Sequence, residues 1–176
     1  MKRVLSLVVL LAISVSICAA QGKVTKETVP GITNLARLET TVACAGAITP
    51  DSVAEIKKMG FVSVVNLRLA SEQGANIDAE AAAAKAAGIK FIHIPFSNTS
   101  PEAGAVDTFL KAIVESGTQP AFIHCGGGNR AAAMWFIKRV MVDKWENDRA
   151  MEEATQLGFT SAALKTFAAN YIQTHK

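Results

Sequence analysis

Short β-branched segments alternate with helix-like segments through most of this chain, and this alternation constrains the fold more than any other feature. Residues 61–67 (FVSVVNL), 89–94 and 120–124 (PAFIH) are short apolar runs typical of buried strands. Between and after them, apolar side chains recur at helical spacing. Strands separated by helices imply right-handed crossovers and a parallel sheet covered by helices. We therefore expect an α/β fold: a single domain with a central, mostly parallel sheet flanked by helices.

Capping residues, glycines and prolines delimit the expected helices. Asp78 is expected to cap the alanine-rich helix, and Gly88 to end it. The helices are expected over residues 51–59, 79–87, 100–114, 130–142, 149–157 and 161–172, the last two as a closing helical pair.

The first twenty residues have the pattern of an export signal. Lys2 and Arg3 are followed by an apolar run of about fourteen residues and then by small residues. The run is shorter than the roughly 18–20 apolar residues that a membrane-spanning helix needs. We predict a signal peptide over residues 1–20, cleaved after Ala20, and a periplasmic or secreted protein. The alternatives are an uncleaved anchor and lipid attachment at Cys18.

The remainder of the chain has the composition of an ordinary globular domain. We expect residues 21–29 to form a flexible lead-in and residues 30–176 to form one α/β domain. Two of the three net positive charges belong to the leader, so the mature chain is nearly neutral. A nucleic-acid binder would show a concentrated positive field. We therefore expect no nucleic-acid partner and no membrane span after cleavage.

One segment, residues 124–130 (HCGGGNR), places reactive residue types between an expected strand and an expected helix. Its three glycines let backbone N–H groups turn inward as an anion cradle, and the following helix directs its positive end at the same place. Arg130 offers a planar fork for two oxygens of a tetrahedral anion. Such a field favours the thiolate of Cys125, which is the nucleophilic form. The structural alternative is a packed cysteine followed by a tight glycine turn.

At these residues the chain resembles the cysteine-dependent tyrosine/dual-specificity phosphatase superfamily, and more closely its bacterial beta-lactamase-hydrolase-like phosphatase family. The resemblance extends to Asn66-Leu67-Arg68, to residues 80–95 and to residues 145–158, and so covers most of the mature chain. It implies a thiolate nucleophile at Cys125, a phosphate clamp at Arg130 and a phosphocysteine intermediate. It also implies an anion-binding loop of Gly126, Gly127, Gly128 and Asn129, with no cofactor and no metal.

Three features depart from the superfamily pattern. Four residues separate Cys125 from Arg130 where the superfamily usually has five; the bacterial branch and rhodanese-type sulfurtransferases share this short spacing. Ala131 stands where a Ser or Thr usually helps the thiolate leave. No clear Asp stands at the place of the general acid, whose absence costs ~10²–10⁴ in rate. The candidates for that role are Glu72, Glu102 and Asp107, of which the last two also fit a helix start and its exposed face.

Several weaker candidates surround the loop. His124 is expected to tune the loop through hydrogen bonding. Arg68, at the end of a neighbouring strand, has two interpretations: a side chain that faces the site, or a surface ion pair. Cys44 also has two: a buried thiol, or a disulfide partner that blocks Cys125.

The sequence thus predicts an exported hydrolase of the tyrosine/dual-specificity phosphatase type, acting on a phosphorylated small molecule or protein. One alternative is a rhodanese-like sulfurtransferase that carries a persulfide on Cys125 and needs no general acid. Another is a catalytically inactive module that binds a phosphate- or sulfate-like anion through Arg130 and the glycine loop.

Overall fold

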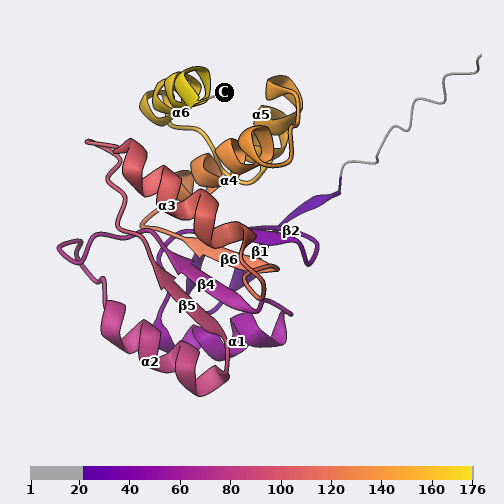
Figure 1. Ribbon diagram of the computed structural model, residues 1–176. Coiled ribbons are helices and arrows are strands. Elements are labelled where there is room, and N and C mark those ends of the chain that lie inside the picture. The colour runs from indigo at the N-terminus through magenta and orange to yellow at the C-terminus, as the bar shows by residue number, and fades with distance from the viewer. Residues whose placement is uncertain (1–21, 176) are drawn as a thin grey trace, which may run out of the picture.

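The computed structural model describes residues 22–175, in which six strands form one sheet with helices on both faces (Figure 1). The predicted signal peptide lies outside the described residues. The strands are β1 (Val24–Val29), β2 (Ile32–Leu38), β3 (Val42–Ala45), β4 (Ser63–Asn66), β5 (Lys90–His93) and β6 (Ala121–His124). Their order across the sheet is β1-β2-β3-β6-β4-β5.

Strands β3, β6, β4 and β5 pair in parallel, and β1 and β2 extend the sheet in antiparallel fashion. β6 is central, between β3 and β4, and every residue of β4 and β6 is buried. This explains why the two strands read as continuous apolar runs, since both of their faces are covered by helices. The α/β fold with a mostly parallel sheet is confirmed.

The helices lie close to the expected segments. They are η1 (Pro50–Ser52), α1 (Val53–Lys58), α2 (Ile77–Ala87), α3 (Ala103–Val114), α4 (Asn129–Met141), α5 (Asn147–Gln156) and α6 (Ala162–His175). One cap differs from the prediction: Asn76, not Asp78, caps α2, because its side chain accepts a hydrogen bond from the backbone N–H of Ala79. Within residues 22–175 no helix has both the length and the apolar character needed to cross a bilayer.

The expectation of a flexible lead-in over residues 21–29 is wrong for β1. Val24–Val29 pairs with β2 as an antiparallel hairpin, and Gly31 at the turn has φ +78°. Arg37 of β2 also forms an ion pair with Glu27 of β1 at 2.7 Å. A polar segment can act as an edge strand because its backbone, rather than an apolar face, supplies the pairing.

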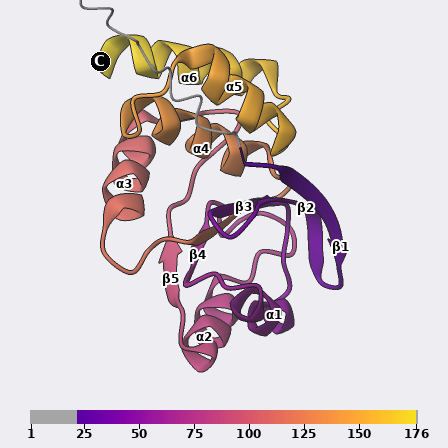
Figure 2. The same ribbon diagram turned by 90° about the vertical axis from the view of Figure 1, so that its right-hand side faces the viewer.

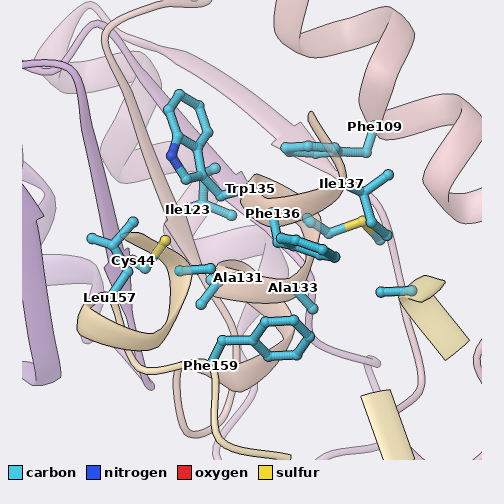
Figure 3. Close-up of a cluster of buried hydrophobic side chains, with 14 of the residues drawn as sticks. Cys44, Phe109, Ile123, Ala131, Ala133, Trp135, Phe136, Ile137, Leu157 and Phe159 are labelled. Carbon is cyan, nitrogen blue, oxygen red and sulfur yellow. The ribbon is translucent and has the colours of Figure 1, made fainter. Parts of the chain in front are cut away.

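The two faces of the sheet carry two separate apolar cores. α1 and α2 cover one face, and α3, α4, α5 and α6 gather on the other (Figures 1 and 2). The second core is the larger, and α4 lies at its centre: ten of its residues are buried. Figure 3 shows Trp135 and Phe136 of α4 among side chains from the sheet and from the segment after α5. The helix that starts at the reactive loop is therefore held firmly on several sides.

Phe122 provides a test of how strongly the central strand stabilises the fold. Its side chain on β6 is fully buried, and it packs edge-to-face on Phe61 with ring centroids 5.7 Å apart. Phe122→Ala should lower the free energy of unfolding by about 3–5 kcal/mol, because it removes apolar contact and leaves a cavity. Urea unfolding measures this. Val114→Ala is the control: Val114 is 53% exposed, so it should change stability by less than about 0.5 kcal/mol.

Candidate active site

The reactive loop lies at the carboxyl edge of the parallel strands, where ligands bind in open α/β sheets. β4 and β6 end side by side, with Asn66 opposite His124. The backbone N–H of Leu67 then donates to the carbonyl of His124 at 2.9 Å. The connections that follow these two strands, residues 67–76 and 125–128, therefore begin next to each other.

The glycine loop is anchored through its carbonyl groups. The carbonyl of Gly126 accepts from the N–H of Ala47 at 3.1 Å, and that of Gly127 accepts from the side chain of Asn34 at 3.3 Å. Since the C=O and N–H of a trans peptide point in opposite directions, these bonds turn the N–H groups of Gly127 and Gly128 away from Ala47 and Asn34. Gly128 has φ +101°, a conformation that glycine adopts without strain.

Cys125 lies where those donors converge. The N–H of Gly128 donates to Sγ of Cys125 at 3.1 Å, and α4 begins at the next residue. This donor and the N-terminal end of a thirteen-residue helix thus lie next to the sulfur. The sulfur borders a cavity of about 310 Å³ lined by Asn98, Cys125, Gly126, Gly127, Asn129 and Arg130. The predicted nucleophile, loop and clamp are thus brought together.

Arg130 is clamped from behind by Glu72. Its Nη1 donates to Oε1 of Glu72 at 2.5 Å, and its Nη2 donates to Oε2 at 2.8 Å. Nη1 also donates to the carbonyls of Phe96 and Leu67. Burial by itself lowers the pKa of the Arg130 guanidinium, but Glu72 and the negative charge of Cys125 outweigh it and raise that pKa above its ordinary value. The guanidinium is a fixed cation beside the sulfur.

Glu72 cannot serve as the general acid in this arrangement. The hydrogen bond from Arg130 is the main cause that lowers the pKa of Glu72 from 4.5 to about 2, against the opposing effect of burial. Bonds from the backbone of Leu69 and from Arg68 act in the same direction. A carboxylate that remains ionised at neutral pH has no proton to give. Its role is to position Arg130.

Arg68 fits neither of the two interpretations left open for it. Its side chain is only 5% exposed, and its Nη atoms donate to the carbonyls of Gln73 and Gly74 at 2.6 and 3.0 Å. Its Nε contacts Oε2 of Glu72 at 3.3 Å. It is therefore a buried residue that shapes the turn around Glu72, and it does not line the cavity at Cys125.

A buried polar layer lies behind the nucleophile. The side chain of Asn66 donates to Oε2 of Glu80 at 2.6 Å and accepts from the backbone N–H of Arg68. His124 is fully buried, with Nε2 3.1 Å from the same Glu80 oxygen but out of line for a hydrogen bond. The expected hydrogen bonding of His124 is thus a short polar contact instead. This layer fixes the ends of β4 and β6.

Two carboxylates proposed for the acid role lie elsewhere. Glu102 precedes α3 and borders a separate cavity of about 260 Å³ beside Pro95 and Phe96. Asp107 lies on α3 and accepts a hydrogen bond from Tyr171 of α6 at 2.5 Å. Burial and the charge of Asp107 raise the pKa of that tyrosine. Asp107 ties two helices together, which corrects its assignment as a possible supporting group of the site.

Asn129 braces the loop from outside. Its Oδ1 accepts from the backbone N–H groups of Thr160 and Ser161, both at 2.7 Å, just before α6. Asn34 and Asn98 were not predicted. Asn34, with φ +48° on β2, holds Gly127, and Asn98 borders the cavity at Cys125. Neither belongs to a motif, so only the fold identifies them.

Cys44 is a buried free thiol, and so is Cys125. The disulfide proposed between them does not form in this structure. Burial raises the pKa of the Cys44 thiol well above its ordinary value, and the negative charges of Cys125 and Glu153 add to the effect. Cys44 on β3 therefore stays protonated in the core, where Figure 3 shows it near Ala131 and Leu157.

The ion pair between Glu72 and Arg130 predicts a specific pH dependence of the free energy of unfolding. Ionised Glu72 stabilises the folded state above pH 4.5, and this contribution is lost as the pH falls toward about 2. Glu72→Gln should lower the free energy of unfolding by about 3 kcal/mol at neutral pH, because Arg130 is left buried without its partner. Urea titrations at progressively lower pH should show a progressively smaller difference in the free energy of unfolding between wild type and Glu72→Gln.

Glu55→Gln is the matched control for this experiment. Glu55 pairs with Lys58 on the surface, where both side chains are well exposed. Its loss should cost less than about 1 kcal/mol. If the difference in free energy of unfolding between wild type and Glu72→Gln stayed constant with pH, the proposed role of the Glu72–Arg130 ion pair would be contradicted.

Several known proteins are similar to this chain in sequence or in fold. Beta-lactamase hydrolase-like proteins from two strains of Xylella fastidiosa are 29% identical to this chain over 110 residues. That match spans 61% of the chain but only 25% of the relatives' own length. Among solved structures, a DUF442 protein of Shewanella putrefaciens superposes with a TM-score of 0.69 at 20% identity, covering 82% of this chain and 89% of that one. TpbA of P. aeruginosa has a TM-score of 0.62 at 22% identity, covering 86% and 89%.

A family model settles the assignment that the motif suggested. It matches residues 34–142, from Asn34 of β2 to the residue after α4, and so includes the nucleophile, the clamp and the glycine loop. The chain belongs to the family described as Beta-lactamase hydrolase-like protein, phosphatase-like domain.

Proposed function

We propose that this protein is an exported cysteine-dependent phosphatase that hydrolyses phosphomonoesters through a phosphocysteine intermediate at Cys125. The observation that carries the proposal is the convergence on one sulfur of the Gly128 N–H, the start of α4 and the clamped Arg130. These groups together offer an anionic nucleophile and a cationic cradle for a tetrahedral dianion.

The first step is transfer of the phosphoryl group to sulfur. The Cys125 thiolate forms the S–P bond as the bond from phosphorus to the leaving oxygen breaks, and the electron pair departs with that oxygen. Arg130 and the N–H groups of the glycine loop bind the equatorial oxygens, whose charge is spread in the transition state. Because Glu72 fixes the guanidinium from behind, little rearrangement of Arg130 is needed.

The second step is hydrolysis of the phosphocysteine. Water forms a new P–O bond, the S–P bond breaks, the electron pair returns to sulfur, and the protons of water leave with the phosphate product. Ala131 offers no hydroxyl to the departing sulfur. The Gly128 N–H, at 3.1 Å, supplies a donor to that sulfur instead.

The substrate is proposed to be a phosphorylated small molecule or protein, handled as tyrosine- and dual-specificity-type phosphatases handle theirs. Support comes from proteins of the same fold: P. aeruginosa TpbA has been solved in complex with pTyr, and the yeast PP-IP phosphatase SIW14 in complex with citrate. Both ligands are anions. A phosphate- or sulfate-like anion fits the same cradle here.

Export is proposed from the first twenty residues. Their cationic start, apolar run and small residues are typical of a secretory signal peptide, with a periplasmic or secreted destination. Mass spectrometry of the exported protein should find a chain that begins at Gln21. A chain that retains Met1 would contradict cleavage.

A sulfurtransferase is the second candidate. The four-residue loop and Ala131 favour it, and persulfide transfer requires no general acid. On incubation with thiosulfate, the Cys125 thiolate would then bond to the outer sulfur as the S–S bond of thiosulfate breaks and sulfite leaves, so that Cys125 gains about 32 Da as a persulfide. An adduct without phosphatase activity would favour this candidate, and neither activity together with sulfate binding would favour an anion-binding module.

The phosphatase proposal is tested by turnover of nitrophenyl phosphate with purified mature protein. Cys125→Ser should lower kcat by roughly 10⁴-fold or more, because the nucleophile is lost. Arg130→Lys keeps the charge but loses the planar fork, and should lower kcat/KM by about 10²–10³-fold. Wild-type turnover no faster than that of Cys125→Ser would refute the proposal.

A further inference from the structure

We propose that the site acts on phosphate compounds whose leaving oxygen is stable as an anion, such as acyl phosphates and phosphates of acidic phenols, and that Asn98 occupies the position from which a general acid would act. The inference rests on the proposed function and narrows its substrate class. It excludes alkyl phosphates, such as phosphoserine or sugar phosphates, as efficient substrates. Among the tyrosine-type substrates of the proposed function, it favours phosphates of phenols that are more acidic than tyrosine.

The lining of the cavity at Cys125 carries the argument. Within the described part of the chain, its six lining residues are three glycine-loop residues, the nucleophile, the clamp and Asn98. None is a carboxylic acid, an imidazole or a phenol. The side chains that can hydrogen-bond to a leaving oxygen are amides or the guanidinium, and neither type gives up a proton at neutral pH.

The carboxylates nearest the loop do not line the cavity at Cys125. Both carboxylate oxygens of Glu72 accept hydrogen bonds from Arg130, and the carboxylate remains ionised. Glu102 borders the adjacent cavity, and Asp107 is bonded to Tyr171. His124 is the last residue of β6 and has no exposed surface. Among the described residues, no carboxylic acid, imidazole or phenol lines the cavity beside the sulfur.

The loop that carries Asn98 is held at its start by a contact with Arg130. Its loop is joined to the clamp through the carbonyl of Phe96, which accepts from Nη1 of Arg130 at 2.8 Å. The loop is also closed locally, because Oγ of Ser97 accepts from the N–H groups of Thr99 and Ser100. Asn98 itself is exposed and borders the cavity. An amide there donates a hydrogen bond to a leaving oxygen without transferring a proton.

The charge balance shows why the leaving group matters. The Cys125 thiolate and a phosphate dianion together carry three negative charges, and so do the phosphocysteine dianion and the departing oxyanion. Without an acid the oxyanion must leave unprotonated. An alkoxide is a poor leaving group, whereas a carboxylate or an acidic phenolate is a good one. The missing acid is worth ~10²–10⁴ in rate.

A series of leaving groups tests the inference on the mature protein. The probes are acetyl phosphate, dinitrophenyl phosphate, nitrophenyl phosphate, phenyl phosphate and glycerol phosphate, with single-turnover release of the leaving group as the readout. We expect the rate of phosphocysteine formation to fall by roughly 10²–10⁴-fold from dinitrophenyl to phenyl phosphate. Similar rates for the two would overturn the inference while leaving the proposed function intact. No turnover of any probe would overturn both.

Two variants test whether the missing acid at position 98 causes this dependence on the leaving group. Asn98→Asp introduces an acid of nearly the same size, and should reduce the ratio between the rates for dinitrophenyl and phenyl phosphate by tenfold or more. The rate on phenyl phosphate should then fall at high pH, because the new acid ionises. Glu102→Gln is the matched control and should leave the ratio as in wild type. A selective loss on phenyl phosphate in Glu102→Gln would identify Glu102 as the acid and overturn the inference.

Discussion

The ion pair between Glu72 and Arg130 is the contact on which the site depends. It joins the connection after β4 to the first turn of α4 through two hydrogen bonds, and Arg68 supports it from the far side. A single carboxylate therefore sets the position of the clamp, keeps the buried guanidinium satisfied, and links two loops that the parallel sheet has brought to one edge. The same commitment removes Glu72 from acid–base chemistry. One carboxylate cannot both hold Arg130 as an anion and donate a proton, and in this protein Glu72 holds Arg130.

The nucleophile is organised by backbone groups rather than by neighbouring side chains. Carbonyls of the glycine loop are tied to Ala47 and Asn34, which leaves the opposite edges of the peptides to face the sulfur. Gly46 lies directly against this loop: a Cβ there would approach the carbonyl oxygen of Gly126 to 3.1 Å. The amides of the glycine loop are thus held by β2 and by the segment just after β3, which contribute no reactive side chain. Such pre-arranged dipoles need little reorganisation during the reaction.

The sequence predicted much of this architecture because its strands are short, apolar and separated by capped helices. The loop from Cys125 to Arg130 was identifiable for a similar reason, since its residues are contiguous. The N-terminal hairpin escaped prediction because β1 is a polar edge strand stabilised by pairing. The roles of Glu72, Asp107 and Asn98 escaped because each depends on a partner far along the chain: Glu72 lies 58 residues from Arg130, and Asp107 lies 64 from Tyr171. Residue type alone cannot distinguish a carboxylate that donates a proton from one that anchors a helix.

The anchoring of the glycine loop by Asn34 also has a consequence for when the site comes into existence. The hydrogen bond from Asn34 to Gly127 spans 93 residues. Asn34 and Gly127 come together through the pairing of β3 with β6, which are far apart in the sequence. Contacts of such long range form late, because the intervening chain loses its freedom before they repay the loss. A nascent chain that has emerged only as far as β5 still lacks β6, Cys125 and the glycine loop. The loop can therefore take its final shape only after β6 has been inserted at the centre of the sheet.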